Sequence, residues 1–366
     1  MDFSLTEDQQ MLSTSVADFA KNESPIARAR RLRDDPIGWE RSMWGQIAEL
    51  GWLAVPFPEE VGGLGWSFSE VALIVEQLGK TLVPEPLVPS ILAGYAVFLA
   101  GTDEQAASVL DRLFSGEVTM ALAMKEPGRR HEPQPSVVRA AEGWTVTGTK
   151  TWVDNGHAAD LVVVSAATDQ GPTLFVVERE HITIQAAGRL DGRRSADLTF
   201  ENAPAQILGT PGNASEILEQ LQDIGAALAV CEGVGVCQKM LDLTLQHLKV
   251  RQQFGVPIGS FQALQHRAVD MFTEVELLRS IAIEVAERLD GERADRRRAV
   301  SAGKVQLAAG GKYVARQAIQ LHGGVGCTDE HDVGMFFKRL HVLDASFGDE
   351  AFHVTRYADE PGFIEA

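Results

Sequence analysis

The amino-acid sequence predicts an α–β–α architecture: an N-terminal α-helical domain at residues 1–117, a middle antiparallel β-barrel or sandwich at 118–210, and a C-terminal four-helix bundle at 211–366. Two observations lead to this prediction. Apolar residues recur at helical spacing in the first and last thirds of the chain. The middle third instead has short runs, most of them rich in β-branched residues, with turn residues and no helical pattern between them.

The N-terminal domain begins with a predicted helix. Thr6 is a candidate N-cap and Gln9 follows three residues later, which is the spacing of a capping box. Apolar residues then follow at helical spacing. Further helical patterns cover residues 39–50, 68–78, 90–100 and 102–113.

The spacing pattern changes at Val118. Strand-like runs cover residues 118–124, 144–146, 161–164, 173–177, 182–184 and 198–200. Turn pairs such as Asn155-Gly156 and Asp191-Gly192 separate them, which is typical of a compact β domain.

Helical patterns return in the last third. We expect helices over 215–250, 261–289 and 294–321 and a final segment from Asp344, together forming an antiparallel bundle. Gly225, Gly233 and Gly235 lie inside the first of these, where close helix packing is expected.

The composition of the chain narrows the possible partners and cellular location. The formal net charge is −18, which disfavours nucleic acid as a partner because phosphate binding needs clustered positive charge. Cys231, Cys237 and Cys327 form neither a CxxC pair nor a disulfide framework, and we expect the first two to be buried packing residues. With no export leader and no apolar run of about 18 residues, we expect no membrane partner and a cytoplasmic location.

Two runs in the last third carry candidate ligand-binding residues: RQQFGVPIGSFQ at 251–262 and QLHGGVG at 320–326. Arg251 falls at the end of a long helix, where a guanidinium can hold a diphosphate with two hydrogen bonds, and Phe254 offers a flat face for stacking. Gly323 and Gly324 remove two side chains at a helix end, so that the backbone can approach a ligand, and Gln320 can hydrogen-bond a ribose or adenine edge. The alternative to a ligand-binding role is a structural one, in which Gly323 caps the C-terminal end of a helix and Arg251 is an ordinary surface residue.

The order and separation of these runs, behind an α–β plan that covers the whole chain, resemble the acyl-CoA dehydrogenase family. In that family the two runs bind the adenine and diphosphate end of FAD, and they reach it from the neighbouring subunit. The resemblance therefore implies an FAD shared at a subunit interface. The implied cofactor-binding residues are Arg251, Phe254, Gln320, Gly323 and Gly324, with Gln253, Ile258 and Leu321 as weaker candidates.

The chain departs from the family where the family places its catalytic base. The resemblance puts the usual Glu at Phe347 and the alternative position, on the long helix, at Gly225, and neither residue can accept a proton. We therefore expect no catalytic residue in this chain. The nearby acids Asp349, Glu350 and Asp223 are interpreted as solvated or capping residues.

The β domain also departs from the family pattern. Glu126-Pro127-Gly128 is kept, but Arg129, Arg130 and His131 replace a small hydroxylated turn; they are candidates for a grip on CoA phosphates or a solvated basic turn. Trp152 is kept. Asp154 replaces the Thr that normally hydrogen-bonds the flavin, and a carboxylate there would repel the developing negative charge.

This pattern resembles the non-catalytic β subunit of heterotetrameric (α2β2) bacterial steroid acyl-CoA dehydrogenases. The resemblance implies a catalytic partner subunit that supplies the Glu base, the isoalloxazine pocket and most contacts to a bulky acyl-CoA, with electron-transferring flavoprotein as the acceptor. Three alternatives stay open: a self-sufficient homomeric enzyme that uses Asp349 or Glu350 as base, a flavin-free scaffold subunit, and a related flavin oxidase or monooxygenase on the same fold.

Overall fold

The computed structural model describes residues 5–128, 139–141 and 143–360. The chain divides into two compact units. Unit 1 combines Met1–Arg30, Phe68–Val83 and Ala226–Ala366, and unit 2 combines Arg31–Ser67 and Pro84–Gly225. Each unit is therefore assembled from segments far apart in sequence. The division into three consecutive domains at 117/118 and 210/211 stays a prediction.

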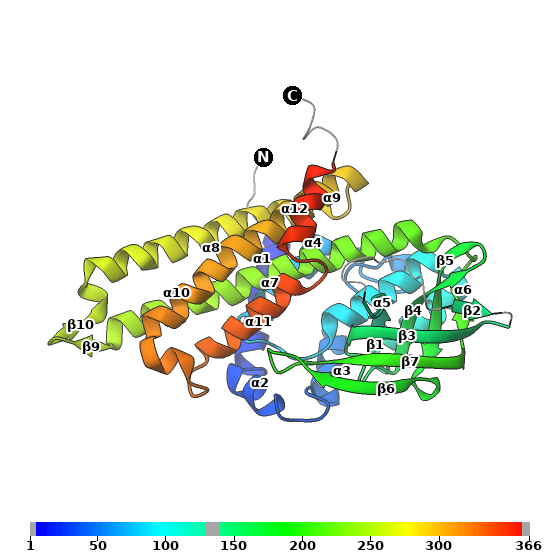
Figure 1. The fold of residues 1–366 in the computed structure, drawn as a ribbon, viewed down its shortest axis with the longest axis horizontal. Helices are drawn as coiled ribbons and strands as arrows, with labels where there is room; N and C mark the ends of the chain where they lie inside the picture. Colours follow the sequence, from blue (N-terminus) through cyan, green and yellow to red (C-terminus); the bar gives the residue numbers. More distant parts are fainter. Residues whose placement is uncertain (1–4, 129–138, 142, 361–366) are drawn as a thin grey trace. The chain divides into compact units, whose positions relative to one another are not determined.

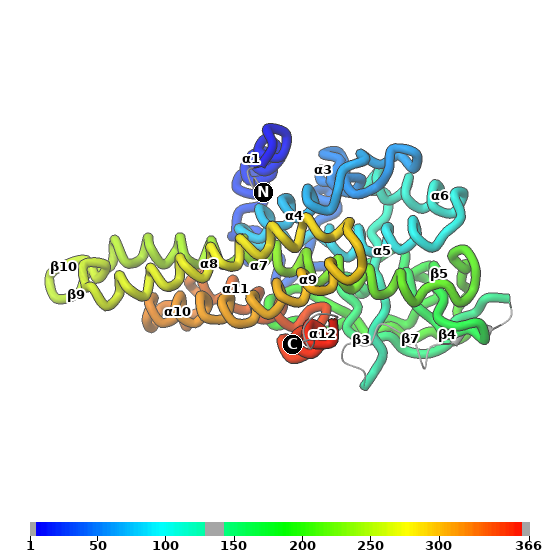
Figure 2. The backbone as a smooth tube through the Cα atoms, turned by 90° about the horizontal axis from the view of Figure 1, so that it is seen from above, coloured from blue at the N-terminus to red at the C-terminus, as the bar shows by residue number. Residues whose placement is uncertain are grey.

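Unit 1 is helical (Figures 1 and 2). Both views show the unit 1 part of α7 side by side with α8, and a short β hairpin joins the two helices. The helices of this unit are α1 (Glu7–Asn22), α4 (Phe68–Gly79), α8 (Gln262–Arg288), α9 (Arg293–Gln306), α10 (Lys312–His322), α11 (Val333–Ala345), α12 (Glu350–Ala358), most of α7 (Ala214–Val250) and the start of α2 (Ile26–Leu32).

The predicted helix starts are confirmed where capping residues mark them. The Thr6 side chain accepts a hydrogen bond from the main-chain N–H of Gln9, and the Gln9 side chain accepts one from the N–H of Thr6. Thr102 and Gln105 form the same capping box at the start of α6 (Asp103–Phe114), in unit 2. A capping box satisfies donors that the first helical turn leaves unpaired.

The C-terminal helices differ from the prediction in two places. The helix expected over 294–321 is α9 followed by a π-helical turn (Leu307–Gly311) and then α10. The final segment was wrongly placed from Asp344, because α11 already begins at Val333. The buried residues of α11 recur at helical spacing: Val333, Phe336, Leu340 and Leu343. In the sequence this short pattern looks like that of an apolar loop, and only packing against neighbouring helices distinguishes the two.

Unit 2 holds the β domain and the helices α3 (Arg41–Glu49), α5 (Leu87–Ala100) and α6. The sheet follows the order β6-β7-β3-β2-β4-β5-β8, and β1 pairs with β4. Its strands are β1 (Met120–Ala123), β2 (Arg139–Ala141), β3 (Thr145–Asp154), β4 (Leu161–Thr168), β5 (Gly171–Glu178), β6 (Thr183–Gly188), β7 (Arg194–Pro204) and β8 (Gln206–Ile207). The predicted β domain is confirmed, but it is mixed and not purely antiparallel, since β1 and β2 both pair with β4 in parallel.

Close packing explains two of the three glycines predicted to matter in α7. A Cβ at Gly235 would lie 1.9 Å from the main-chain oxygen of Glu76 in α4, and one at Gly233 would lie 2.4 Å from a methyl of Leu307. The clash at Gly235 is with main chain, so α4 can approach α7 there only with glycine, whereas at Gly233 the leucine side chain would have to move.

Within the described residues α7 is the one helix that is long and apolar enough to cross a membrane, which corrects the expectation that no run would reach that length. However, 89% of its most apolar window is buried inside the structure, as in the core helix of a folded protein. Cys231 and Cys237 are buried on this helix, as predicted.

Candidate functional site

The first predicted binding run forms a tight hairpin at the C-terminal end of α7. The N–H of Arg251 donates to the oxygen of His247 (2.9 Å), and β9 (Gln252–Gln253) pairs with β10 (Val256–Pro257). Phe254 (φ +56°) and Gly255 (φ +83°) form the two-residue turn. Positive φ at both central residues is the geometry of a hairpin turn that matches the strand twist. The hairpin therefore holds Phe254 at its tip.

Most of the candidate binding side chains of this hairpin are exposed on the surface of the chain. Phe254 is 91% exposed and touches the edge of Phe261, with ring centroids 6.1 Å apart. Among the described residues the Arg251 guanidinium has no hydrogen-bond partner or ion pair. Gln253 is exposed and Ile258 is half-buried. The hairpin therefore presents an aromatic ring and a guanidinium on the surface of the chain.

The second predicted run ends α10. Gly323 has φ +63°, and both Gly323 and Gly324 are exposed together with Gln320. A Cβ at either glycine would meet no atom of this chain within 4 Å, so the packing of the chain itself does not require glycine at 324. An open backbone of this kind leaves room for a ligand. Leu321 is buried, so only its main chain can take part.

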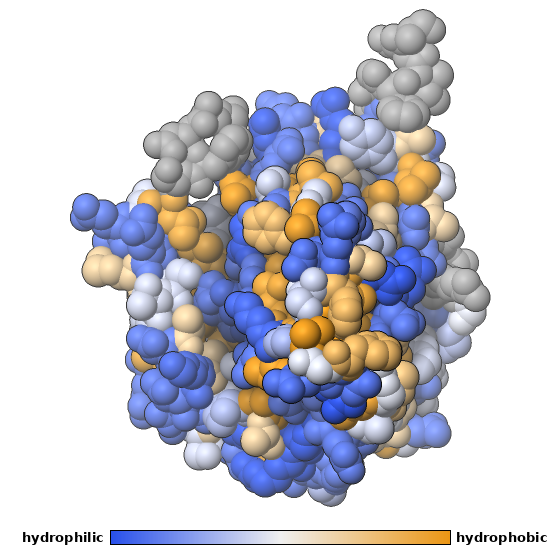
Figure 3. Space-filling view, turned by 90° about the vertical axis from the view of Figure 1, so that its left-hand side faces the viewer, coloured by the Kyte–Doolittle hydropathy of each residue, from blue (hydrophilic) through white to orange (hydrophobic). Residues whose placement is uncertain are grey.

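Unit 1 brings these two runs together. The ring of His247, on the last turn of α7, lies 4.6 Å from the ring of His322, which ends α10. Figure 3, which faces the end of the molecule that carries the β9–β10 hairpin, shows apolar side chains gathered among hydrophilic ones. The exposed apolar residues of this part of unit 1 are Val250, Phe254, Val256, Phe261, Val269, Phe272, Leu277 and Val325.

Phe347 occupies a firmly built loop between α11 and α12. The buried Lys304 ammonium donates to the main-chain oxygens of Leu343 (2.7 Å), Asp344 (2.9 Å) and Ser346 (2.7 Å), which caps the end of α11. Phe347 has φ +54°, an unfavourable conformation for a bulky side chain, and its oxygen lies 3.1 Å from Nε2 of His353. The loop is fully formed, but the residue at its turn cannot act as a base.

Two of the three nearby acids, Asp349 and Glu350, are a capping residue and a solvated residue, as expected. Asp349 accepts a hydrogen bond from the N–H of Phe352 (3.0 Å) and caps α12. Glu350 is exposed, and its carboxylate lies 3.5 Å from the Lys312 ammonium. Asp223 was wrongly interpreted as solvated or capping: it is fully buried, because residues 221–231 of α7 are surrounded by core.

A further acid on α7 was not predicted from the sequence. Glu232 is buried and pairs with Arg339 of α11, with Oε1 2.8 Å from Nε and Oε2 2.6 Å from Nη2. The two-point contact uses both carboxylate oxygens, so Glu232 is held as a structural partner and is unsuited to remove a substrate proton.

In unit 2, Trp152 and Asp154 end β3. Trp152 has φ +55° and is 61% exposed. Its main-chain N–H donates to the carboxylate of Asp197 (3.0 Å). Asp154 forms an ion pair with Arg189 at 2.8 Å, a partner that the sequence did not indicate. Burial, together with the charge of Arg189, lowers the pKa of the nearby Lys125. Arg129, Arg130 and His131 lie outside the described residues.

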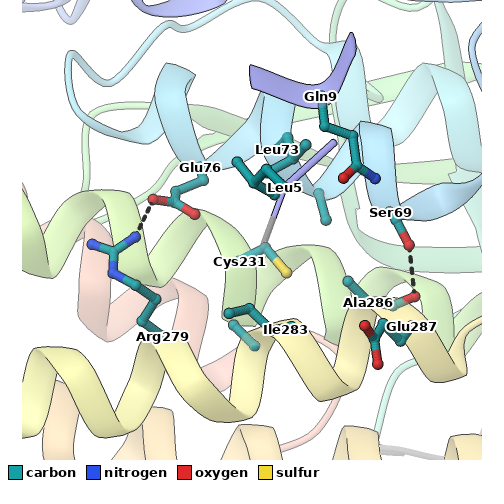
Figure 4. A pocket seen from close by; sticks show the side chains of 12 residues that line it. Leu5, Gln9, Ser69, Leu73, Glu76, Cys231, Arg279, Ile283, Ala286 and Glu287 are labelled. Atoms are coloured by element: carbon teal, nitrogen blue, oxygen red, sulfur yellow. Dashed lines mark hydrogen bonds and ion pairs between the residues drawn. The ribbon is translucent and has the colours of Figure 1, made fainter. Parts of the chain in front are cut away.

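A small cavity lies within unit 1 (Figure 4). It measures about 110 Å³, and Cys231 lines it between the Glu76–Arg279 ion pair (2.6 Å) and the Ser69 hydroxyl, which donates to the oxygen of Ala286 (3.3 Å). Burial raises the pKa of the Cys231 thiol, which therefore stays neutral. Pockets for drug-sized ligands measure roughly 300–1,000 Å³, so this cavity is too small for an acyl-CoA. No three described His, Cys, Asp or Glu side chains are placed to hold a metal ion.

Comparison with known proteins identifies the family. The family model for the acyl-CoA dehydrogenase N-terminal domain matches residues 6–117, and the model for the C-terminal domain matches 217–360. Acyl-CoA dehydrogenase IpdE2 of Mycobacterium tuberculosis is 32% identical over 92% of this chain and 91% of its own length. The chain belongs to the acyl-CoA dehydrogenase family. It therefore has the family's N-terminal helical, middle β and C-terminal helical fold, and FAD-dependent oxidoreduction of acyl-CoA thioesters is the activity of the family.

Two solved structures resemble this member of the acyl-CoA dehydrogenase family over nearly its whole length. A variant of the Tcur3481-Tcur3483 steroid acyl-CoA dehydrogenase superposes with a TM-score of 0.86 at 26% identity, covering 96% of this chain and 97% of that one. The ChsE4-ChsE5 complex of Mycobacterium tuberculosis gives a TM-score of 0.89 at 25% identity and covers all of both chains.

The residues present fit one end of FAD better than the other. The exposed Arg251 guanidinium, the Phe254 ring and the open backbone at Gly323-Gly324 suit a diphosphate and an adenine. Asp154, the predicted counterpart of the family's flavin-contacting Thr, is a paired carboxylate that can accept but cannot donate a hydrogen bond.

Proposed function

We propose that this chain is the non-catalytic subunit of a mixed acyl-CoA dehydrogenase oligomer and lends FAD contacts to a catalytic partner. The observation that carries the proposal is Phe347, which stands at the turn where the family's base is expected. The surrounding Lys304 and His353 contacts keep that turn intact, so the base is replaced within a formed loop.

The lending role rests on the residues that face outward. Arg251 would hold the diphosphate of a flavin bound mainly by the partner, Phe254 would cover its adenine end from water, and Gln320 with the Gly323-Gly324 backbone would position it. Bound FAD supplies the hydride acceptor. The partner would supply the carboxylate base, the ring pocket and most of the acyl-CoA site, and electron-transferring flavoprotein would reoxidise the complex.

The substrate class follows from likeness to other proteins. A structure described as a steroid acyl-CoA dehydrogenase, and another described as a two-chain complex, match nearly the whole length of this chain. We therefore assign a bulky steroid side-chain acyl-CoA as the substrate and an α2β2 assembly with one flavin per pair of unlike subunits.

The test separates this proposal from a self-sufficient enzyme. The complex is assayed for acyl-CoA dehydrogenation with Asp349→Asn or Glu350→Gln introduced in this chain alone. We expect turnover within about twofold of the unmodified complex, because Asn retains an oxygen for the α12 cap and Glu350 is a surface residue. Loss of turnover, with the oligomer and its flavin intact, would make one of these acids the base and would reject the proposal.

A further inference from the structure

Three histidines form a stack between the two flavin-lending runs. His322 is 4% exposed, and its ring lies 4.6 Å from that of His247 and 4.4 Å from that of His331. The three rings come from α7, α10 and the segment just before α11. Because Arg251 follows His247 by one turn and Gly323 follows His322 directly, the stack connects the two runs.

Hydrogen bonds hold two of the rings in place. Nδ1 of His322 donates to the oxygen of Ala318 at 2.7 Å, so Nε2 is the nitrogen at which the ring gains or loses its second proton. Nε2 is buried and forms no hydrogen bond of normal geometry among the described residues, although the main-chain oxygen of Leu243 lies near enough to raise the pKa of the ring. In His331, Nδ1 accepts from the N–H of Val333 (3.2 Å), which places the proton of a neutral ring on Nε2.

The surroundings of His322 oppose a positive charge. Burial is the main cause that lowers its pKa, to about 4, and His331 and His247 lower it further. The main-chain oxygens of Ala318 and Leu243 act in the opposite direction. Burial, followed by His331 and the Arg251 guanidinium, also lowers the pKa of His247. Among the described residues, the charged and titratable groups that shift the pKa of His322 and His247 are thus Arg251 and the histidines of the stack.

We propose that the stack is a proton-sensitive positioning element that holds Arg251 and the Gly323-Gly324 turn in register for the lent flavin only while His322 is uncharged. A proton on His322 places a buried cation between two imidazoles, and the rings separate or take up water to relieve it. Since His322 directly precedes Gly323, that movement displaces the glycine turn. This inference rests on the proposed lending role.

The test follows FAD release from the mixed complex by flavin fluorescence between pH 8 and pH 4. In the unmodified complex the FAD affinity stays constant near neutrality and falls in acid by up to about tenfold per pH unit, as expected for one linked proton. His322→Phe keeps a planar ring in the stack but cannot titrate, so its FAD affinity lacks this acid-dependent fall. His266→Phe changes an exposed histidine of α8 and serves as the matched control.

A second variant keeps the proposal testable if His322→Phe does not fold. His247→Phe removes a positive neighbour of His322 and moves the acid release to higher pH. Identical pH profiles for the unmodified complex, His322→Phe and His247→Phe would overturn the inference. Arg251→Ala, measured at pH 7, separates the two claims: an unchanged FAD affinity rejects the lending role itself, whereas a loss of about 10- to 100-fold with identical histidine profiles rejects only the stack.

Discussion

At the scale of single residues, the side chains that this chain keeps from its family serve two different purposes. Phe254 and Arg251 are kept facing outward, where they make few or no contacts within the chain. Glu126 and Lys150 are kept for the core: the Lys150 ammonium donates to Glu126 (3.0 Å), Ser165 (3.1 Å) and the oxygen of Met124 (3.2 Å), with both charged side chains buried. Their presence next to Trp152 is thus no sign of a working flavin-ring site.

The Lys150–Glu126 pair gives a prediction about stability. Glu126→Gln leaves a buried ammonium without its counter-charge, and we expect a loss of about 3–5 kcal/mol in the free energy of unfolding. The exposed Glu117, which pairs with Arg112 at 2.7 Å, is the control, and Glu117→Gln is expected to cost less than about 1 kcal/mol. Urea denaturation of both variants measures the difference, and equal costs would mean that the buried charge needs no partner.

The pair also sets a pH dependence. Burial lowers the pKa of Lys150 from 10.5 to about 8. Between pH 8 and 10.5 the unfolded chain therefore binds more protons at this position than the folded chain does. The contribution of Lys150 to the free energy of unfolding consequently rises with pH across that window and is constant below it.

At the scale of elements, α7 determines how unit 1 is built. Its glycines allow α4 to approach so closely that a Cβ at Gly235 would lie 1.9 Å from the oxygen of Glu76. Gly235→Ala must therefore push the two helices apart, and we expect a loss of about 1–3 kcal/mol or more in stability.

Gly324→Ala is the matched control for that substitution. A Cβ there meets no atom of the chain within 4 Å, so we expect the melting temperature of the chain to stay within about 1–2 °C of the original. Thermal unfolding of the two variants side by side tests this contrast. A Gly235→Ala variant as stable as the original would mean that α4 and α7 are not packed as described.

Elements were predictable where local chemistry marks them. The capping boxes at Thr6 and Thr102 specify their own conformations, and Gly255 suits the positive φ of its hairpin turn. Pairing direction was not predictable, because β1 pairs with β4 in parallel although β2 and β3 lie between them in the sequence, and no local pattern indicates such a partner. The helix α11 was not predictable for the same reason, because its apolar residues can be recognised as a buried helix face only from the helices that pack against them.

At the scale of the whole molecule, the candidate site was predictable only in part. The two lending runs could be found because their residues are adjacent in sequence, and Phe347 could be found by counting from them. The burial of Asp223, the Asp154–Arg189 pair and the histidine stack depend on contacts between segments distant in sequence. Such contacts leave no local pattern of residues for the sequence to reveal.

The central proposal is that this chain completes a flavin site formed mainly by another subunit. The most direct test is the visible absorption spectrum and native mass of the chain, purified alone and co-expressed with candidate partner dehydrogenases. We expect no flavin absorbance from the chain alone, and a yellow mixed oligomer with about one FAD per pair of unlike subunits. A yellow assembly of this chain alone that dehydrogenates an acyl-CoA would contradict the account.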